Sequence, residues 1–454
     1  MIDFKKEIDA RKDDLLRDIA TLIEIPSMQD DDTVGENQPY GKPCRDALDA
    51  MLAMGKRDGF VCDEVDGHAG HIDIGEGEEC FGILGHLDVV PVNPEGWNSD
   101  PFKMTMIDGK IYGRGVADDK GPLLAGYYAA KIIHDLGLPT KMKTRIIFGC
   151  NEELGSNCLR HYFQHRPYPV AGFTPDAAFP VIYGEKAGAH AAISGTVASK
   201  GLISICAGER FNVVPEVCHA TLEGAVELYS ASFEAFKAEH HVGGSLEQVG
   251  ENTLVTIIGK SAHASKPELG INSIVVLCQY ITTVCDNQLA ALLANELSNY
   301  YGKALNIDHV GQMGPLTLST GVIRYEDEKA LIQVDMRCPH DMDFDHLKQA
   351  YKDLGEKYGL EIDLEVGEAL FVDRESELIK KLHGAYVTIS GDTNPPQAIG
   401  GGTYAKTMPN CVGFGPEFVG EENFIHENNE SICVESLLRA MEIYAVALYD
   451  LIKA

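Results

Sequence analysis

Short apolar segments that end in acidic or histidine side chains recur in the N-terminal part of the chain, and this pattern limits the fold more than any other feature. Cys80–Leu84 runs into Gly85-His86-Leu87-Asp88, and Lys143–Cys150 runs into Asn151-Glu152-Glu153. Helical patterns separate these segments. Strands that alternate with helices form α/β sheets, whose sites lie at the carboxyl ends of the strands. The sequence therefore predicts an α/β sheet with a site at that edge.

The pair His86 and Asp88 suits a metal site, because side chains two apart on a strand point to the same side of the sheet. A metal-binding histidine needs a carboxylate that fixes its tautomer and ring orientation. A lone His-x-Asp is more often an ordinary polar feature, so other ligands must join it. Glu152 and Glu153 are candidates, since adjacent carboxylates after a buried strand repel each other unless a cation or a proton intervenes.

Two more segments carry acidic residues that could take part in such a site. Asp118 and Asp119 follow a glycine-rich stretch and precede an apolar helix, so the simpler interpretation is a helix N-cap. Asp176 lies just before the expected strand Phe179–Tyr183. In contrast, Asp66-Gly67-His68-Ala69-Gly70-His71 holds two histidines among glycines, which favours a turn between strands over a metal site.

The length of 454 residues predicts two domains, because one hydrophobic core seldom serves so long a chain. After about residue 184 the pattern changes to strands rich in small residues and a few helices, including a long one over Ile274–Ala294. Glycine turns and ligand-like residues resume near residue 400. We expect a catalytic domain built from residues 1–184 and 385–454, with residues 185–384 inserted as an α+β domain.

The amino-acid composition limits the binding partners and the cellular compartment that we expect. With 38 Lys and Arg against 69 Asp and Glu, the formal net charge is −31, which disfavours nucleic acid and anionic membrane surfaces. Twelve cysteines without a CxxC pair fit reduced thiols. The charged start and the lack of an apolar run of about 20 residues predict neither a signal peptide nor a membrane span. We expect a cytoplasmic protein.

The motifs together resemble the M20 family of dinuclear metallopeptidases, with the bacterial peptidase V dipeptidases as the nearest group. The resemblance covers nearly the whole chain, and its motifs occur in the family's order. They are GHLDVVP around His86, GRGVADDKG around Asp118, the Glu152-Glu153 pair, FTPDAAFP around Asp176, and FIHENNE around His426. The resemblance implies a zinc-peptidase-like α/β catalytic domain, with a central mixed sheet flanked by helices, plus an inserted α+β lid.

The resemblance also implies roles for individual residues. His86 and Asp176 would hold one metal ion, Glu153 and His426 would hold the other, and Asp118 would bridge the two. Asp118 is preferred to Asp119 because it occupies the Asp of the family pattern GRGxxDxKG. Glu152 would be the general base that takes a proton from the bridging water, and Asp88 would support His86. The two divalent ions are expected to be zinc, with manganese or cobalt as alternatives.

In the insertion, the segment Gly259–Ser265 resembles the family segment whose histidine stabilises the oxyanion, which implies that role for His263. Asn212 and Arg337 are similar to residues that contact the substrate carboxylate, and a guanidinium suits a planar carboxylate. A turn residue before Val-Val-Pro is an equally good interpretation of Asn212. The insertion is longer than the usual dimerisation lobe of the family, and the resemblance to peptidase V implies a monomer.

The function implied is that of a zinc dipeptidase acting on unblocked dipeptides. An N-acyl amino acid deacylase would use the same catalytic residues, so the motifs leave this alternative open. A binding protein that has lost turnover is a third interpretation. The presence of Glu152 and all five ligands argues against it, because function depends on the site and not on the fold.

Overall fold

The computed structural model describes residues 2–454 and separates into two units. Unit 1 comprises residues 1–184, 371–397 and 402–454, and unit 2 comprises residues 185–370 and 398–401. The predicted end of the insertion at residue 384 is therefore misplaced, because it falls inside α9 (Glu377–Ser390). That helix packs on α10 (Val434–Ile452) of unit 1, which buries its apolar residues.

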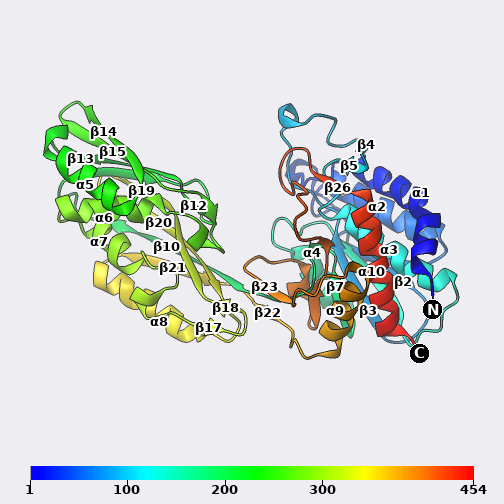
Figure 1. Cartoon of the computed structure of the whole chain (residues 1–454). Coiled ribbons are helices and arrows are strands. Elements are labelled where there is room, and N and C mark those ends of the chain that lie inside the picture. Colours follow the sequence, from blue (N-terminus) through cyan, green and yellow to red (C-terminus); the bar gives the residue numbers. More distant parts are fainter. Residues whose placement is uncertain (1) are drawn as a thin grey trace. The chain divides into compact units, whose positions relative to one another are not determined.

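A mixed sheet forms the centre of unit 1 (Figure 1). Its inner strands run parallel, whereas the pairs β1–β2, β2–β6 and β24–β9 are antiparallel. In sheet order, the strands are β1 (Val61–Val65), β2 (Ala69–Ile74), β6 (Lys143–Gly149), β3 (Cys80–His86), β7 (Ala171–Thr174), β24 (Cys411–Gly413), β9 (Ile182–Glu185) and β22 (Leu370–Phe371), with β23 (Gln397–Ile399) paired to β9.

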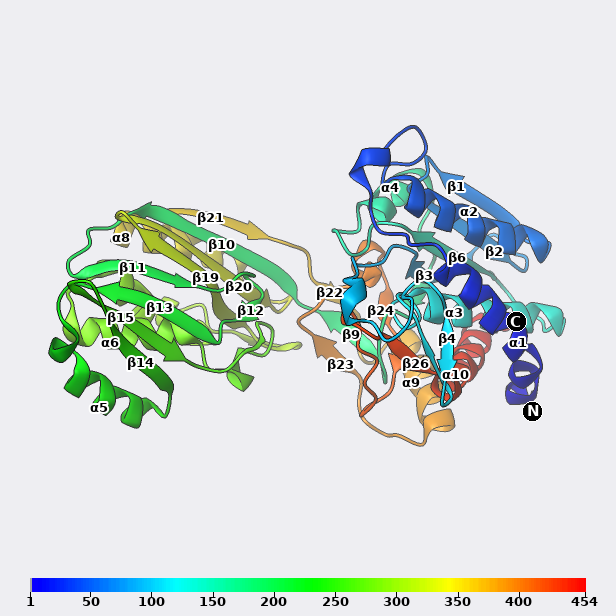
Figure 2. The same cartoon turned by 90° about the horizontal axis from the view of Figure 1, so that it is seen from above.

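Helices cover this sheet and pack against it and against one another through the apolar faces of their amphipathic sequences. α10 packs against α3 and α9, and α1 packs against α3 and α10 (Figures 1 and 2). α2 and α4 contact β1 and β2. Besides α9 and α10, the helices of unit 1 are α1 (Phe4–Ile23), α2 (Lys42–Arg57), α3 (Lys120–Asp135) and α4 (Asn157–His165). The short strands are β4 (Thr105–Ile107), β5 (Lys110–Tyr112), β8 (Ala177–Ala178), β25 (Pro416–Glu417) and β26 (Ser431–Cys433).

Unit 2 is an antiparallel sheet with helices packed on it. Alternate residues along β15 are buried, as expected for a sheet with one covered face. In sheet order, the strands are β14 (Gly243–Val249), β15 (Asn252–Ile258), β13 (Val217–Leu222), β11 (Leu202–Ala207), β19 (Thr317–Glu326), β20 (Lys329–Cys338), β10 (Ala187–Thr196) and β21 (Glu361–Val366). Two short pairs are β12 (Val213–Val214) with β16 (Ala262–His263), and β17 (Val310–Gly311) with β18 (Gly314–Pro315).

The helices of unit 2 are α5 (Ser230–His240), α6 (Ser273–Val284), α7 (Gln288–Ala291) and α8 (Phe344–Tyr358). The long helix predicted over Ile274–Ala294 is wrong. It breaks after Val284, and Asn287 starts a new helix by accepting hydrogen bonds from the backbone N–H groups of Leu289 and Ala290. The predicted fold class, a mixed α/β domain with an additional α+β part, is confirmed. No helix within residues 2–454 is long and apolar enough to cross a membrane.

Candidate metal centre

The carboxyl ends of neighbouring parallel strands bring the predicted residues of unit 1 together. His86 is the last residue of β3, and it pairs with Gly149, the last residue of β6. Glu152 and Glu153 follow β6 within four residues, and Asp176 follows β7. The Asp119 carboxylate can approach the end of β3 closely because Gly85 has no side chain: a Cβ atom there would lie 2.5 Å from Asp119 Oδ2.

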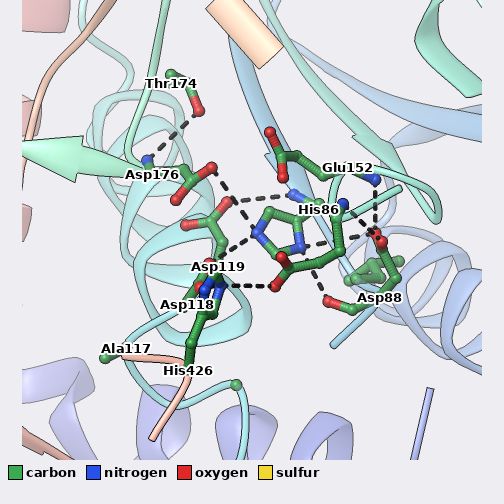
Figure 3. Close-up of polar contacts among 12 residues, drawn as sticks. His86, Asp88, Ala117, Asp118, Asp119, Glu152, Thr174, Asp176 and His426 are labelled. Atoms are coloured by element: carbon green, nitrogen blue, oxygen red, sulfur yellow. Dashed lines mark hydrogen bonds and ion pairs between the residues drawn. The ribbon is translucent and has the colours of Figure 1, made fainter. Parts of the chain in front are cut away.

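Asp118 is the centre of the arrangement. It precedes α3, and its two carboxylate oxygens face different histidines (Figure 3). Oδ1 lies 2.8 Å from Nε2 of His86, and Oδ2 lies 2.8 Å from Nε2 of His426. Asp176 Oδ2 lies 3.8 Å from the His86 Nε2, and Glu153 Oε1 lies 3.1 Å from the His426 Nε2. Each histidine therefore has Asp118 and one further carboxylate beside it.

These residues form two overlapping sets of ligand atoms. His86, Asp118 and Asp176 offer one set, and Asp118, Glu153 and His426 offer the other. The ligand atoms in each set lie within 4.8 Å of one another, and imidazole and carboxylate groups are common ligands of zinc and related ions. The five residues predicted as ligands are thus gathered by the fold, although they come from five separate segments of the chain.

Asp88 supports the site in a different way from the one predicted. The His86 Nδ1 lies 2.9 Å from the main-chain carbonyl of Asp88, whereas the Asp88 carboxylate is 3.6 Å away. That carboxylate instead accepts hydrogen bonds from the backbone N–H groups of Glu152 and Glu153, at 3.1 and 3.2 Å. The Asp88 main chain therefore orients the imidazole, and its side chain orients the loop of the two glutamates.

Glu152 and Glu153 have different surroundings although they are adjacent. The Glu153 carboxylate contacts His426. Within residues 2–454, no hydrogen bond holds the carboxylate of Glu152, which lies among the residues of the centre (Figure 3). Burial raises the pKa of Glu152 to about 8, and repulsion from Asp88, Glu153 and Asp118 adds to this effect against the attraction of His86.

The electrostatics of the site fit a bound cation. Burial, followed by repulsion from Asp118, raises the pKa of Asp176 well above its usual range. The pKa of His426 rises to about 10 because its imidazole is hydrogen-bonded to Asp118 and Glu153. Buried carboxylates so close together repel one another unless protons or cations compensate their charge. The donor set therefore suits divalent ions.

The sequence did not indicate how three residues, Glu430, Arg114 and Asp119, hold the loop that contains Asp118. Glu430 is buried and accepts hydrogen bonds from the backbone N–H groups of Gly115, Ala117 and Asp118, at 2.9 to 3.1 Å. It also pairs with Arg114 at 2.6 Å. Glu430 is the last residue of the FIHENNE motif, so the motif itself was the available signal.

Asp119, the third of these residues, does not act as the N-cap that the sequence suggested. Although it is the residue before α3, its side chain caps no N–H of that helix. Its Oδ2 accepts the backbone N–H of His86 at 3.2 Å, and its Oδ1 has no hydrogen-bond partner within the described residues. Asp119 thus ties the Asp118 loop to the end of β3.

The three residues predicted in the insertion lie close together within unit 2. β12 pairs with β16, and the carbonyl of Asn212 accepts the backbone N–H of Ala264 at 2.9 Å, next to His263. Burial, followed by the positive charge of Arg337, lowers the pKa of His263. Asp335 is buried and binds Arg337 through Nε and Nη2, at 2.9 and 3.0 Å. Arg337 Nη1 donates to the carbonyl of Gly400 at 2.9 Å.

The mixed α/β fold and the clustered ligands place the protein among α/β proteins with a candidate metal centre at a sheet edge. Residues 82–450 match peptidase family M20/M25/M40. The chain belongs to this family, as its motifs predicted, and the protein is a peptidase.

Individual relatives and solved structures are also similar to this chain. The chain is 33% identical over 472 residues to "Putative dipeptidase YtjP" of Bacillus subtilis, with 100% of both chains covered. Among solved structures, human carnosine dipeptidase 1 has a TM-score of 0.60 at 15% identity and covers 98% of this chain and 97% of its own. The M20 family metallo-carboxypeptidase Sso-CP2 from Sulfolobus solfataricus has a TM-score of 0.58 at 14% identity, covering 96% and 99%. At these identities the two structures show a shared fold.

Proposed function

We propose that the protein is a dipeptidase that depends on two divalent metal ions and hydrolyses the peptide bond of unblocked dipeptides. The observation that carries this proposal is the position of Asp118, which presents one carboxylate oxygen to His86 and the other to His426, each at 2.8 Å. A carboxylate shared in this way can bridge two cations, as dinuclear hydrolases require. The name of the Bacillus subtilis relative supports a dipeptidase.

His86 and Asp176 would hold one ion, Glu153 and His426 would hold the other, and Asp118 would contact both. Such ions, when bound, lower the pKa of a water molecule and polarise the scissile carbonyl. Zinc suits two imidazoles with three carboxylates, and manganese or cobalt would also be accepted.

Glu152 is the residue we assign to proton transfer. Its neighbour Glu153 is engaged by His426, whereas the carboxylate of Glu152 has no hydrogen-bonding partner within the described residues. A carboxylate that stays unengaged beside the ligands can take a proton from water and pass it to the leaving amine. The side chain of Asp88 contributes by fixing the backbone of Glu152 through its 3.1 Å hydrogen bond.

Arg337, His263 and Asn212 are proposed to act on the substrate. Asp335 and Gly400 occupy the Nε edge of the Arg337 guanidinium and one N–H of Nη1. One N–H on each terminal nitrogen is left, enough for a bidentate contact with a planar carboxylate. His263 would stabilise the oxyanion, since its Nδ1 is engaged by Ser265 at 2.8 Å and its Nε2 is left to donate.

Hydrolysis of a matched substrate panel tests the proposal. Free dipeptides, including a β-alanyl one, are compared with their N-acetylated forms after the metal is removed by a chelator and zinc, manganese or cobalt is added back. We expect cleavage of the free dipeptides alone, restored by metal. Cleavage of the acetylated set would instead indicate an N-acyl amino acid deacylase, and the absence of any turnover would contradict both enzymatic functions.

A further inference from the structure

A second cluster of metal-ligating side chains lies on the surface of unit 1 and shares no residue with the centre described above. Asp66 stands in the turn between β1 and β2, and His161 and His165 lie on α4. Two residues four apart on a helix share one face. One ligand atom from each of the three residues lies within 4.8 Å of the other two.

The distances within this cluster are close to those of ligands on a common ion. Nε2 of His161 lies 2.9 Å from Oδ2 of Asp66. Two ligand atoms held at about 2.0–2.1 Å from one tetrahedral zinc ion are roughly 3.3 Å apart, so a small widening would admit the ion. Side chains on the surface can make that adjustment without moving the backbone of β1, β2 or α4.

Neighbouring groups fix the tautomer of His165 and the orientation of the His161 ring. Nδ1 of His165 lies 3.0 Å from the carbonyl of His161, so it carries the proton and leaves the Nε2 lone pair for an ion. His68 stacks on His161 with ring centroids 4.0 Å apart, and its Nδ1 is engaged by Tyr40 at 2.8 Å. These contacts restrict the rotation of the His161 ring.

The charges around the cluster also favour a cation. Asp66 is exposed and places a carboxylate beside the two imidazoles. Arg166, the residue that follows α4, is bound to Asp63.

We propose that Asp66, His161 and His165 bind one further divalent cation of borderline character, such as Zn²⁺, Ni²⁺ or Co²⁺, with water completing its coordination. Two imidazoles and one carboxylate suit these ions better than Mg²⁺ or Ca²⁺, which prefer oxygen ligands. The ion would tie the β1–β2 turn to α4, the helix that follows the loop of Glu152 and Glu153. It would hold together segments 95 residues apart in the sequence.

Nickel binding to the untagged, metal-loaded full chain tests this site. After loose metal is removed by gel filtration, Ni²⁺ alone is titrated by isothermal calorimetry. We expect one added ion per chain and an affinity at least tenfold weaker in His165→Gln, with a smaller loss in Asp66→Asn. The matched control His240→Gln, which changes an exposed histidine of unit 2 stacked on Phe236, should bind as the wild type does.

Two further results make the test decisive. Glu153→Gln, which alters the buried centre, should leave the additional nickel site intact, and this outcome would separate the surface site from that centre. Circular dichroism checks that His165→Gln is folded. The proposal is overturned if the folded His165→Gln variant binds nickel as tightly as the wild type, or if the wild type binds no ion beyond those it already holds.

Discussion

The two units differ in what their interiors contain. Unit 1 buries charged groups around its sheet edge, among them His86, Asp118, Asp119 and Glu430. The core of unit 2 is a continuous apolar cluster between sheet and helices. Buried charges lower stability unless each one is paired or hydrogen-bonded, so they are retained where chemistry needs them.

The residues proposed to act in function are therefore concentrated among the buried charged groups of unit 1. In unit 1, the buried Glu430 is held by a loop far away in the sequence, the one that contains Asp118. In unit 2, the buried carboxylate of Asp335 holds Arg337, which is itself a proposed substrate contact. Substitutions at charged positions of unit 1 should therefore have larger effects than those at polar positions of the unit 2 scaffold.

The largest effect is expected from Glu152→Gln, which removes the proposed base and keeps its shape. Loss of general acid–base catalysis should lower kcat by about 10²- to 10⁴-fold. Both metal ions should remain bound, because Glu152 is not among the proposed ligands. Steady-state kinetics with metal analysis checks this. The adjacent Glu153→Gln serves as the matched comparison and should reduce metal content; a normal kcat in Glu152→Gln would contradict the assignment.

Glu430→Gln should have the next largest effect, and on stability as well as activity. The change leaves the buried Arg114 guanidinium without its counter-charge, and breaking a buried pair costs about 3–5 kcal/mol. Chemical denaturation of the variant measures the loss. In a double-mutant cycle, Arg114→Met with Glu430→Gln should be less destabilised than the two single changes added together. Strict additivity would show that the two charges are not coupled.

His71 is a buried histidine of unit 1 that lies outside the candidate metal centre. It tests how burial of a titratable group affects stability. Burial, and then the positive charge of Arg145, lowers its pKa to about 4, and its Nδ1 lies 2.9 Å from the Tyr162 hydroxyl. Below the ordinary value of 6.5, the unfolded chain takes up a proton that the folded chain does not. Stability is therefore lost as pH falls from that value toward 4, by about 2 kcal/mol between roughly pH 7 and pH 5.

Thermal unfolding at several pH values checks this prediction. His71→Gln has no group that titrates in this range, so its melting temperature should fall less than that of the wild type between those two pH values. The wild type and the variant are compared in the same buffers, because other groups titrate in both. An identical pH dependence in the two proteins would show that His71 does not contribute.

The sequence predicts that several residues of the candidate metal centre gather at one edge of the sheet, because they follow strand ends. Parallel pairing of β3 with β6 and β7 places His86, Glu152 and Asp176 at one edge, and this follows from the alternation of strands and helices. Assigning Asp118 and His426 required the family resemblance. The role of the Asp88 carboxylate could not be predicted, because its partners are backbone N–H groups, which have no signature in the side-chain pattern. For Glu430 the FIHENNE motif marked the position but not its partners, Arg114 and the backbone N–H groups of the Asp118 loop.

The broken helix of unit 2 shows a second limit. Apolar residues continue at helical spacing through Ile274–Ala294, so periodicity alone predicts one helix. The break depends on tertiary contacts, since the side-chain nitrogen of Asn287 donates to the carbonyls of Ala198 and Ser199, at 3.2 and 2.8 Å. A propensity argument does not contain these partners.

Asn287→Ala should have the smallest effect, because it removes a cap and two hydrogen bonds without leaving a buried charge. Loss of an N-cap costs about 1–2 kcal/mol. Asn287→Ser keeps an oxygen that can cap Leu289 and Ala290 and loses only the donor to Ala198 and Ser199, so it should be less destabilised. Hydrogen exchange localises the loss to α7, and kcat should be unchanged. A loss as large as that of Glu430→Gln would erase the distinction between a charged site and an apolar scaffold.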